Sequence, residues 1–336
     1  MISAIHSAIP SPFRFSLLLA SLLLINGCSG GNAPENSWEN AVKGNYSAAL
    51  SDNGALSIIG SITHGGSLWN TAENERLYDW NHRQGEFSNI IASGFSPDGL
   101  FALTADHQTM VLWNTTDGSP VTFWTAPSEV HSIDLSPNGN YALLGLADHS
   151  AVLFDVKRGG IKRSFYHTGP VLSVDLSNDG KIAITGSQDR SAKLWNMTSG
   201  EILFNWEHKD DVITVAISAD GKRALSVAKY DRAVIWDTET GKKIGALPLK
   251  ASAIKRGQAF SSARFSMDGL QLLTGNADRE VQLWDTNNMT EIAHWTVPKR
   301  DPWKPTSASI LALSFSPSPN EFFAIASNGF THHLKK

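Results

Sequence analysis

The residues that could do chemistry are one cysteine, eleven histidines and 32 acidic residues in a chain of 336. None of the common catalytic spacings is present: the sequence has no nucleophile elbow G-x-S-x-G, no phosphate loop G-x-x-x-x-G-K-S/T and no zinc signature H-E-x-x-H. A single cysteine excludes an internal disulfide framework and any zinc site with two thiolate ligands. The sequence therefore predicts a protein that is not an enzyme and has no metal site and no cofactor.

The remaining titratable residues fit structural roles. His332 and His333 are adjacent on a predicted strand, so their side chains point to opposite faces and do not form a chelate. Asp148, Asp189 and Asp278 lie in predicted turns, where a carboxylate accepts backbone N–H groups.

Composition and net charge exclude further classes of protein. The chain is 41% hydrophobic and 18% charged, as in folded globular proteins. Its formal net charge of −4 argues against a nucleic-acid binder that relies on positive charge.

The lone cysteine follows an apolar run of eleven residues, from Phe15 to Ile25, with Arg14 before it. A run this short suits the hydrophobic region of an export signal better than a helix crossing ~30 Å of hydrocarbon. The run ends at Ile25-Asn26-Gly27-Cys28, which resembles a bacterial lipobox, with Asn26 as a departure from the usual small or aliphatic residue.

This resemblance implies a cleaved signal peptide over residues 1–27, acyl chains on Cys28 and a flexible tether over residues 28–36. Ser29 after the cysteine implies the periplasmic face of the outer membrane rather than the inner membrane. Two alternatives remain: an ordinary cleaved signal in which Cys28 has no role, and an uncleaved signal anchor.

The elements that position any site come from a repeat over residues 37–336. A Ser-x-x-Gly turn recurs between two stretches of alternating apolar and polar residues, which predicts a β-hairpin each time. The turns begin at Ser51, Ser96, Ser136, Ser177, Ser218 and Ser266, with a degenerate copy at Ser316.

Two further features recur in each unit. An aliphatic residue followed by an aromatic lies within 18 residues of each serine, with Trp69, Trp113, Phe154, Trp195, Trp236 and Trp284 as the aromatics. A third position, about 11 residues later, holds Trp80, Trp124, Tyr166, Trp206, Leu247 and Trp295. Each unit therefore predicts four short strands, which we call a to d in chain order.

This pattern resembles the WD40 repeat family, which implies an all-β, seven-bladed β-propeller of four-stranded antiparallel blades around a channel. The family's polar tetrad joins a His before strand a, a Ser or Thr on strand b, an Asp in the b–c turn and the Trp of strand c. The fourth unit matches it with His167, Thr185, Asp189 and Trp195. The fifth matches with His208, Ser226 and Trp236, whereas units one, two, three and six lack the histidine.

The seventh unit supplies only three strands, between Leu311 and Leu334. Trp38 precedes Ser51 by the interval that separates other strand-d tryptophans from the next serine. We therefore expect Asn36 to Glu39 to form strand d of the last blade and to close the ring.

Function is expected in the connections that depart from the repeat. Three d–a connections are enlarged: Asn81–Ile90, Leu249–Phe260 and Thr296–Ser309. Trp303 is the one tryptophan outside the repeat. We expect it to anchor an acidic partner together with basic residues of the last two connections, which are Lys250, Lys255, Arg256, Lys299, Arg300 and Lys304. The alternative is that these charges are only solvated and that Trp303 folds back over the rim.

The sequence thus favours a membrane-anchored, non-catalytic interaction scaffold of the bacterial cell envelope, whose partners are the bilayer at Cys28 and an unidentified envelope protein. Two alternatives are an enzyme or small-ligand binder that uses the central channel, and an outer-membrane assembly factor. The second rests only on analogy with propeller lipoproteins of that pathway.

Overall fold

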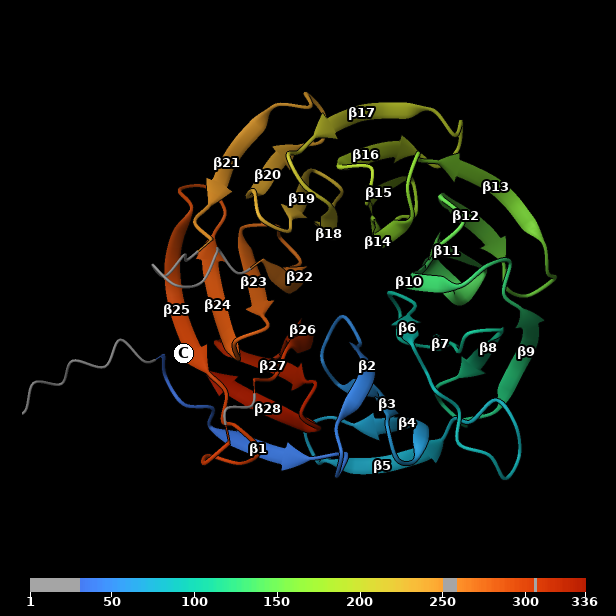
Figure 1. Ribbon diagram of the computed structural model, residues 1–336, viewed down its shortest axis with the longest axis vertical. Coiled ribbons are helices and arrows are strands. Elements are labelled where there is room, and N and C mark those ends of the chain that lie inside the picture. The colour runs from blue at the N-terminus through green and yellow to red at the C-terminus, as the bar shows by residue number, and fades with distance from the viewer. Residues whose placement is uncertain (1–30, 250–258, 305–306) are drawn as a thin grey trace, which may run out of the picture. The chain divides into compact units, whose positions relative to one another are not determined.

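The structure, a computed structural model, describes residues 31–249, 259–304 and 307–336. In this part of the chain, 28 strands form seven antiparallel four-stranded sheets, arranged as blades around a central axis (Figure 1). The predicted seven-bladed propeller is confirmed. Blades 1 to 6 are meanders, so their strands a to d run in chain order from the centre to the rim, whereas the outermost strand of blade 7 comes from the N-terminal segment.

The blades contain these strands: blade 1, β2 (Asn45–Leu50), β3 (Leu56–Ser61), β4 (Gly65–Asn70) and β5 (Glu75–Asp79); blade 2, β6 (Ala92–Phe95), β7 (Phe101–Ala105), β8 (Thr109–Asn114) and β9 (Pro120–Thr125); blade 3, β10 (Val130–Leu135), β11 (Tyr141–Leu146), β12 (Ser150–Asp155) and β13 (Ile161–Tyr166). They continue with blade 4, β14 (Val171–Leu176), β15 (Ile182–Ser187), β16 (Ser191–Asn196) and β17 (Ile202–Glu207); blade 5, β18 (Val212–Ile217), β19 (Arg223–Ala228), β20 (Ala233–Asp237) and β21 (Lys243–Leu247). The last are blade 6, β22 (Phe260–Phe265), β23 (Gln271–Asn276), β24 (Glu280–Asp285) and β25 (Thr290–Thr296); and blade 7, β26 (Ile310–Phe315), β27 (Glu321–Ala326), β28 (Phe330–Lys335) and β1 (Asn36–Glu39). One 3-10 turn, η1 (Pro137–Gly139), follows β10.

The recurring serine sets the a–b turn through its side chain. In blade 4, Ser177 Oγ donates to Asp179 at 2.7 Å and accepts the Ile182 N–H at 3.2 Å, across the turn. Gly180 has φ of +67°, a left-handed conformation that glycine adopts without steric cost. The turn therefore favours the order serine, then aspartate or asparagine, then glycine, which the six Ser-x-x-Gly copies share.

The core lies between blades rather than in one central cluster. Seven apolar clusters occur in the described residues, each formed by two adjacent blades. A strand-d tryptophan can connect its blade to the next one. Trp206 of blade 4 stacks on Trp236 of blade 5 with ring centroids 4.8 Å apart, and the Trp206 indole donates to Gly241 O at 3.0 Å. The structure corrects one strand-d position, because Phe165 is the buried residue in blade 3 and Tyr166 is 70% exposed.

The first strand closes the ring, as predicted. β1 pairs antiparallel with β28, with Trp38 opposite Thr331. The segment before it differs from the expected flexible tether: the Asn32 N–H donates to His294 O at 2.7 Å, and the Thr296 N–H donates to Asn32 O at 3.0 Å. Asn32 thus extends the outer edge of β25, while residues 28–30 lie outside the described residues.

Candidate functional site

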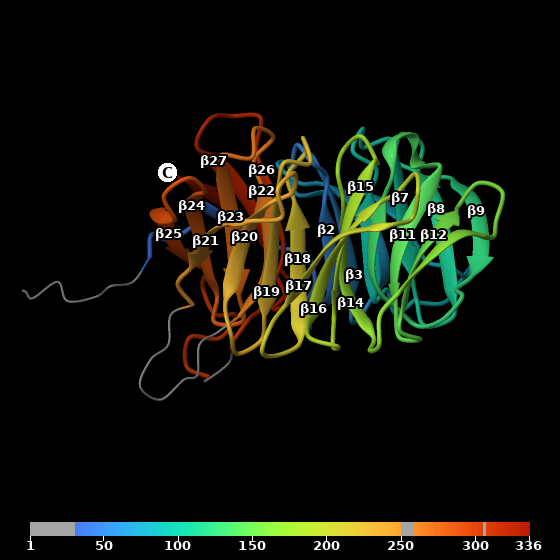
Figure 2. The same ribbon diagram turned by 90° about the horizontal axis from the view of Figure 1, so that it is seen from above.

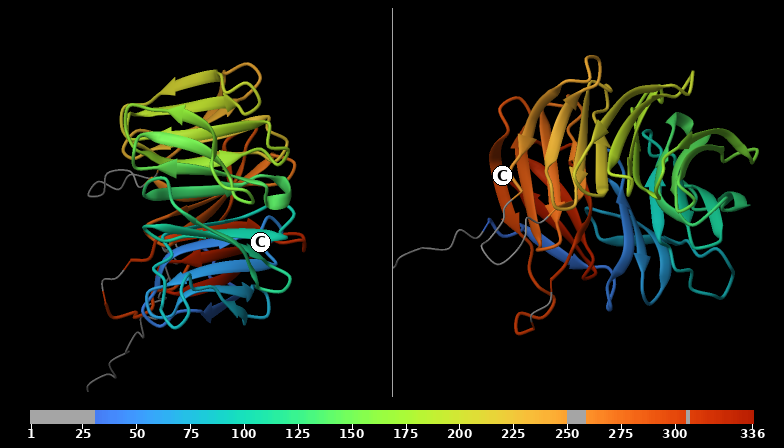
Figure 3. Two further views of the ribbon diagram at one scale, coloured as in Figure 1. Left: turned by 90° about the vertical axis from the view of Figure 1, so that its right-hand side faces the viewer. Right: turned by 45° about the horizontal axis from the view of Figure 1, so that its top comes forward.

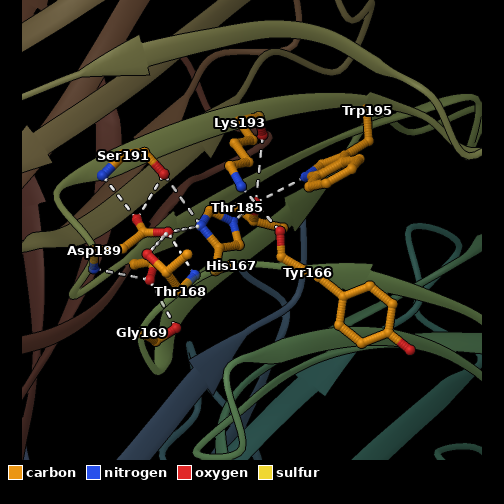
Figure 4. Close-up of polar contacts among 10 residues, drawn as sticks. Tyr166, His167, Thr168, Gly169, Thr185, Asp189, Ser191, Lys193 and Trp195 are labelled. Carbon is orange, nitrogen blue, oxygen red and sulfur yellow. Dashed lines mark hydrogen bonds and ion pairs between the residues drawn. The ribbon is translucent and has the colours of Figure 1, made fainter.

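Blade 4 contains a polar network whose residue types resemble those of a catalytic triad (Figure 4). His167 Nδ1 lies 2.9 Å from Asp189 Oδ2, and its Nε2 lies 2.7 Å from Thr185 Oγ1. The Trp195 indole donates to the same hydroxyl at 2.8 Å. The structure therefore brings together all four residues that the family resemblance implied.

The order of donors and acceptors fits a neutral histidine. The Asp189 carboxylate accepts from Nδ1–H, so Nε2 accepts the Thr185 O–H, whose oxygen accepts the indole N–H. Burial lowers the pKa of His167 to about 4, although the charge of Asp189 opposes this. Because the His167 side chain is fully buried and both ring nitrogens have partners, we interpret this network as structural.

The same network occurs in blade 5. His208 Nε2 lies 2.9 Å from Ser226 Oγ, which also accepts the Trp236 indole at 2.7 Å. Asp231, one place out of register in the sequence, still reaches within 3.7 Å of His208 Nδ1.

Blade 2 also has this network, which corrects the expectation that its histidine is missing. His82 Nε2 lies 2.8 Å from Thr104 Oγ1, and the Trp113 indole donates to that oxygen at 2.8 Å. Asp106 Oδ2 is 3.3 Å from His82 Nδ1. The residues inserted between His82 and β6 lengthen the interval from His82 to the repeat serine. For this reason the sequence pattern did not identify His82 as the histidine of the tetrad.

The interval between His82 and the strand-d aromatic before it nevertheless identifies this histidine in the sequence. His82 follows the buried Trp80 by two residues, as His208 follows Trp206 and His167 follows Phe165. Counting from the preceding strand-d aromatic therefore finds the histidine, because an enlarged loop does not disturb that interval.

The connection after β25 presents Trp303 to solvent. Trp303 is 94% exposed, and its N–H donates to Asp301 Oδ1 at 3.0 Å. The Lys304 N–H donates to Asp301 O at 3.2 Å, so Asp301 organises the turn that carries the indole. Figures 2 and 3 show this connection projecting from one face of the ring. The alternative that Trp303 folds back over the rim is wrong.

Arg300, expected to face a partner, is engaged inside the molecule. Its guanidinium donates to Asn328 O at 2.9 Å and Ala41 O at 2.5 Å, and pairs with Glu39 at 2.8 Å. It also lies 5.0 Å from the Phe330 ring centroid. Arg300 therefore fixes the Trp303 connection to blade 7 and to the residues after β1.

The other basic residues of the expected sector divide into two groups. Lys299 Nζ donates to Lys304 O at 3.3 Å, and Lys304 Nζ lies 3.4 Å from Asp301. The Lys304 side chain is largely exposed and is therefore available to a partner. The remaining three lie outside the described residues: Lys250, Lys255 and Arg256.

The innermost strands surround the ring axis (Figure 1), and their residues line a cavity of about 360 Å³. Strand a is the inner edge of each blade, so some of its N–H groups have no ladder partner. The preceding blade satisfies them: Asp134 accepts the Leu176 N–H at 2.8 Å, and Asp175 accepts the Ile217 N–H at 2.7 Å.

One end of this cavity is crossed by polar side chains. Asn178 donates to Asp52 at 3.0 Å, although blades 1 and 4 lie on different sides of the ring. Arg264 of blade 6 forms an ion pair with the same Asp52 carboxylate. Asp52, Asn178 and Arg264 therefore bridge the a–b turn end, which we call the floor.

Within the described residues, no cluster of three His, Cys, Asp or Glu side chains is arranged to hold a metal ion. The same part of the chain contains no helix with the length and apolar character needed to cross a bilayer.

Comparison with known proteins identifies two segments of the chain. The family model of the WD domain, G-beta repeat (WD40), matches residues 159–196 and 254–285. The first segment carries the network of His167, Thr185, Asp189 and Trp195. No curated protein matches the chain.

Proposed function

This chain is a WD40-repeat β-propeller, and on that premise we propose that it is a non-catalytic protein-interaction scaffold held at a membrane of the bacterial cell envelope. The blades are regular and their polar networks are internally satisfied, so recognition falls to the connections. The observation that carries the proposal is Trp303, whose indole is solvent-exposed on an organised turn. Such an aromatic is the kind of residue that dominates binding energy when a partner buries it.

The partner we propose has an apolar pocket with acidic residues beside it. Trp303 would fill the pocket, and the exposed ammonium of Lys304 would face the acidic rim. Three other exposed apolar side chains lie in d–a connections or b–c turns of the same face, on blades 1 and 2 and the segment before blade 1, and these are Val42, Ile62 and Phe87. They could widen the contact around the central anchor.

The test is recovery of crosslinked envelope proteins from intact cells that carry the Trp303→Ala chain. We expect recovery of the specific partner to fall at least tenfold, since losing a buried aromatic anchor costs about 2 kcal/mol or more. Tyr230→Ala removes an exposed aromatic elsewhere on the same face and is the matched control. Equal recovery with wild type and Trp303→Ala would contradict the proposal.

Arg300→Glu is unsuitable as a direct test of partner charge. It would break the contacts of Arg300 with Glu39, Ala41 and Asn328, and so release the whole connection. Lys304→Glu tests the charge instead, because within the described residues Lys304 forms a single ion pair, with Asp301. We expect Lys304→Glu to weaken partner recovery without changing the melting temperature.

The membrane placement rests on the lipobox resemblance at Cys28. Asn32 is hydrogen-bonded to β25, and the four residue-to-residue steps from Cys28 to Asn32 span at most about 13 Å. An acyl chain on Cys28 would therefore hold the rim of blade 6 close to the bilayer. Two or three chains anchor stably, because each buried CH₂ contributes about 0.8 kcal/mol. If Cys28→Ser remains in the membrane fraction, the lipid anchor is incorrect.

A second candidate function, binding of a small ligand in the central channel, is favoured by the cavity of about 360 Å³. Cavities of this size fall within the range that holds small molecules.

A further inference from the structure

The central cavity has two chemically different ends. Seven cavity-lining residues lie toward the d–a connections, each near the start of an innermost strand or, in blade 2, just before it. Most of their side chains are apolar: Tyr46, Ile91, His131, Leu172, Ile213, Ser261 and Leu311. Tyr46 is 51% exposed there, and the four aliphatic residues are partly exposed. We call this ring the entrance, because the other end is bridged by the floor residues.

The floor carries more acid than base. Asp52, Asp134 and Asp175 line the cavity together with a single cation, Arg264. Arg264 is ion-paired with Asp52. Asp134 and Asp175 lie close enough to affect each other's ionisation, and within the described residues the charge of Arg264 acts on both of them as well as on Asp52.

The acid pair retains a proton more strongly than isolated carboxyl groups do. Burial raises the pKa of Asp134 well above its usual range, and the nearby charge of Asp175 adds to this effect. Burial also raises the pKa of Asp175, although Arg264 opposes the rise. A cation bound beside these two carboxyl groups would offset the cost of holding them charged in a buried place.

Polar atoms without partners line the same cavity. Ser262 is only 9% exposed, and its hydroxyl makes no hydrogen bond. The His131 Nδ1 and Ser93 Oγ atoms are also buried without a partner, and both residues line the cavity. Unpartnered buried polar atoms are costly, so they indicate a place where a bound molecule would supply hydrogen bonds.

We propose that the cavity binds a slender alkyl cation, with an ammonium or guanidinium group at the Asp134 and Asp175 pair and an apolar stem within the entrance ring. The stem matches Ile91, Leu172 and Leu311, and the cationic tip matches the excess of carboxyl groups. Such a group can come from a free amine or from a Lys or Arg side chain of a bound protein. This site is independent of Trp303.

The test is calorimetric titration of the full chain with n-pentylamine, agmatine and neutral n-pentanol. We expect each amine to bind at least tenfold more tightly than the alcohol. Asp175→Asn should reduce amine binding at least tenfold while retaining an oxygen that accepts the Ile217 N–H. Glu207→Gln, a charge removal on the exposed edge of blade 4, is the matched control and should leave binding unchanged.

Two further measurements distinguish a protein side chain from a free amine as the ligand, and the cavity from the Trp303 surface as the site. A peptide with one central lysine that binds more tightly than pentylamine identifies a protein side chain as the ligand, whereas weaker peptide binding identifies a free amine. Trp303→Ala should leave amine affinity unchanged. Equal affinities for pentylamine and pentanol in the wild-type chain would overturn the proposal, and so would unchanged amine binding by a folded Asp175→Asn variant. Because the first comparison needs no substitution, it decides the matter even if that variant does not fold.

Discussion

Single histidines contribute to this protein as neutral, buried hydrogen-bonding groups. His167, His82 and His208 each contact a strand-b hydroxyl that also accepts a tryptophan indole. His332 is fully buried in β28, where its Nδ1 lies 2.8 Å from Ser37 Oγ. Burial lowers the pKa of each of these four side chains, which favours the neutral form of the imidazole.

The blade 2 network predicts a stability role for His82. His82→Ala leaves Thr104 without one partner and should destabilise the protein by about 1–3 kcal/mol. Chemical denaturation measures this change. His107→Ala, at an exposed position in the b–c turn of the same blade, is the control and should change stability by less than about 0.5 kcal/mol. Equal effects of the two substitutions would show that the blade 2 network does not contribute to the stability of the protein.

Two of these histidines predict a loss of stability in acid. Burial lowers the pKa values of His167 and His332 from 6.5 to about 4. The unfolded chain therefore binds protons from pH 6.5 downward while the folded chain does not, so stability is full above pH 6.5 and falls toward pH 4. The fall from 6.5 to 4 corresponds to at most about 3 kcal/mol for each histidine. Melting temperatures across this range should decline, and His332→Leu should flatten the decline.

Strand β1 is the element on which the ring depends. It pairs with β28 and covers an edge that would otherwise be free to pair with another chain. Residues at its two ends extend this contact, because Asn32 is bonded to β25 and the Asn40 side chain accepts the Thr331 hydroxyl at 2.5 Å. The Asn40 amide also donates to Asn74 Oδ1 of blade 1 at 2.8 Å, so the N-terminal segment joins blades 6, 7 and 1.

Deleting residues 36–41 should abolish cooperative unfolding, because blade 7 then has three strands and the contacts of Asn40 with Asn74 and His64 of blade 1 are lost. A broad thermal transition and concentration-dependent aggregation are the expected readouts. A synthetic peptide of residues 32–42, added in trans, should restore part of the cooperativity by filling the edge of β28. A wild-type melting temperature in the deletion variant would contradict this role for β1.

At the scale of the whole molecule, the junctions between blades are unequal. The apolar cluster between blades 7 and 1 has three buried members, Ile59, Ala312 and Ile325, and is the smallest in the described residues. Polar contacts add to it: Ser314 Oγ donates to Ser51 O at 2.9 Å, and the Asn45 N–H donates to Ser327 O at 3.0 Å. The ring is therefore least apolar where the chain closes it.

This junction should open before the others. Hydrogen exchange followed by mass spectrometry should show faster exchange in β2 and β26 than in β14 and β18, because local opening follows regions with little buried apolar surface. The Arg300 contacts are part of the same junction, so Arg300→Ala should increase the difference. Equal exchange rates in all innermost strands would show that the polar contacts between blades 7 and 1 compensate fully for the small apolar cluster there.

The sequence by itself determined the number of blades, their strands and the closure of the ring by Trp38 and its neighbours. These features depend on local physics: period-two alternation, the hydrogen bonds of a Ser-x-Asp-Gly turn, and intervals that count from one aromatic to the next. Only the tertiary structure decided that His82 completes a network, that Arg300 holds its own loop and that Asp52 meets Asn178 across the ring. Those contacts join residues whose separation in the chain says little about their distance, because the ring geometry, and not local spacing, brings them together.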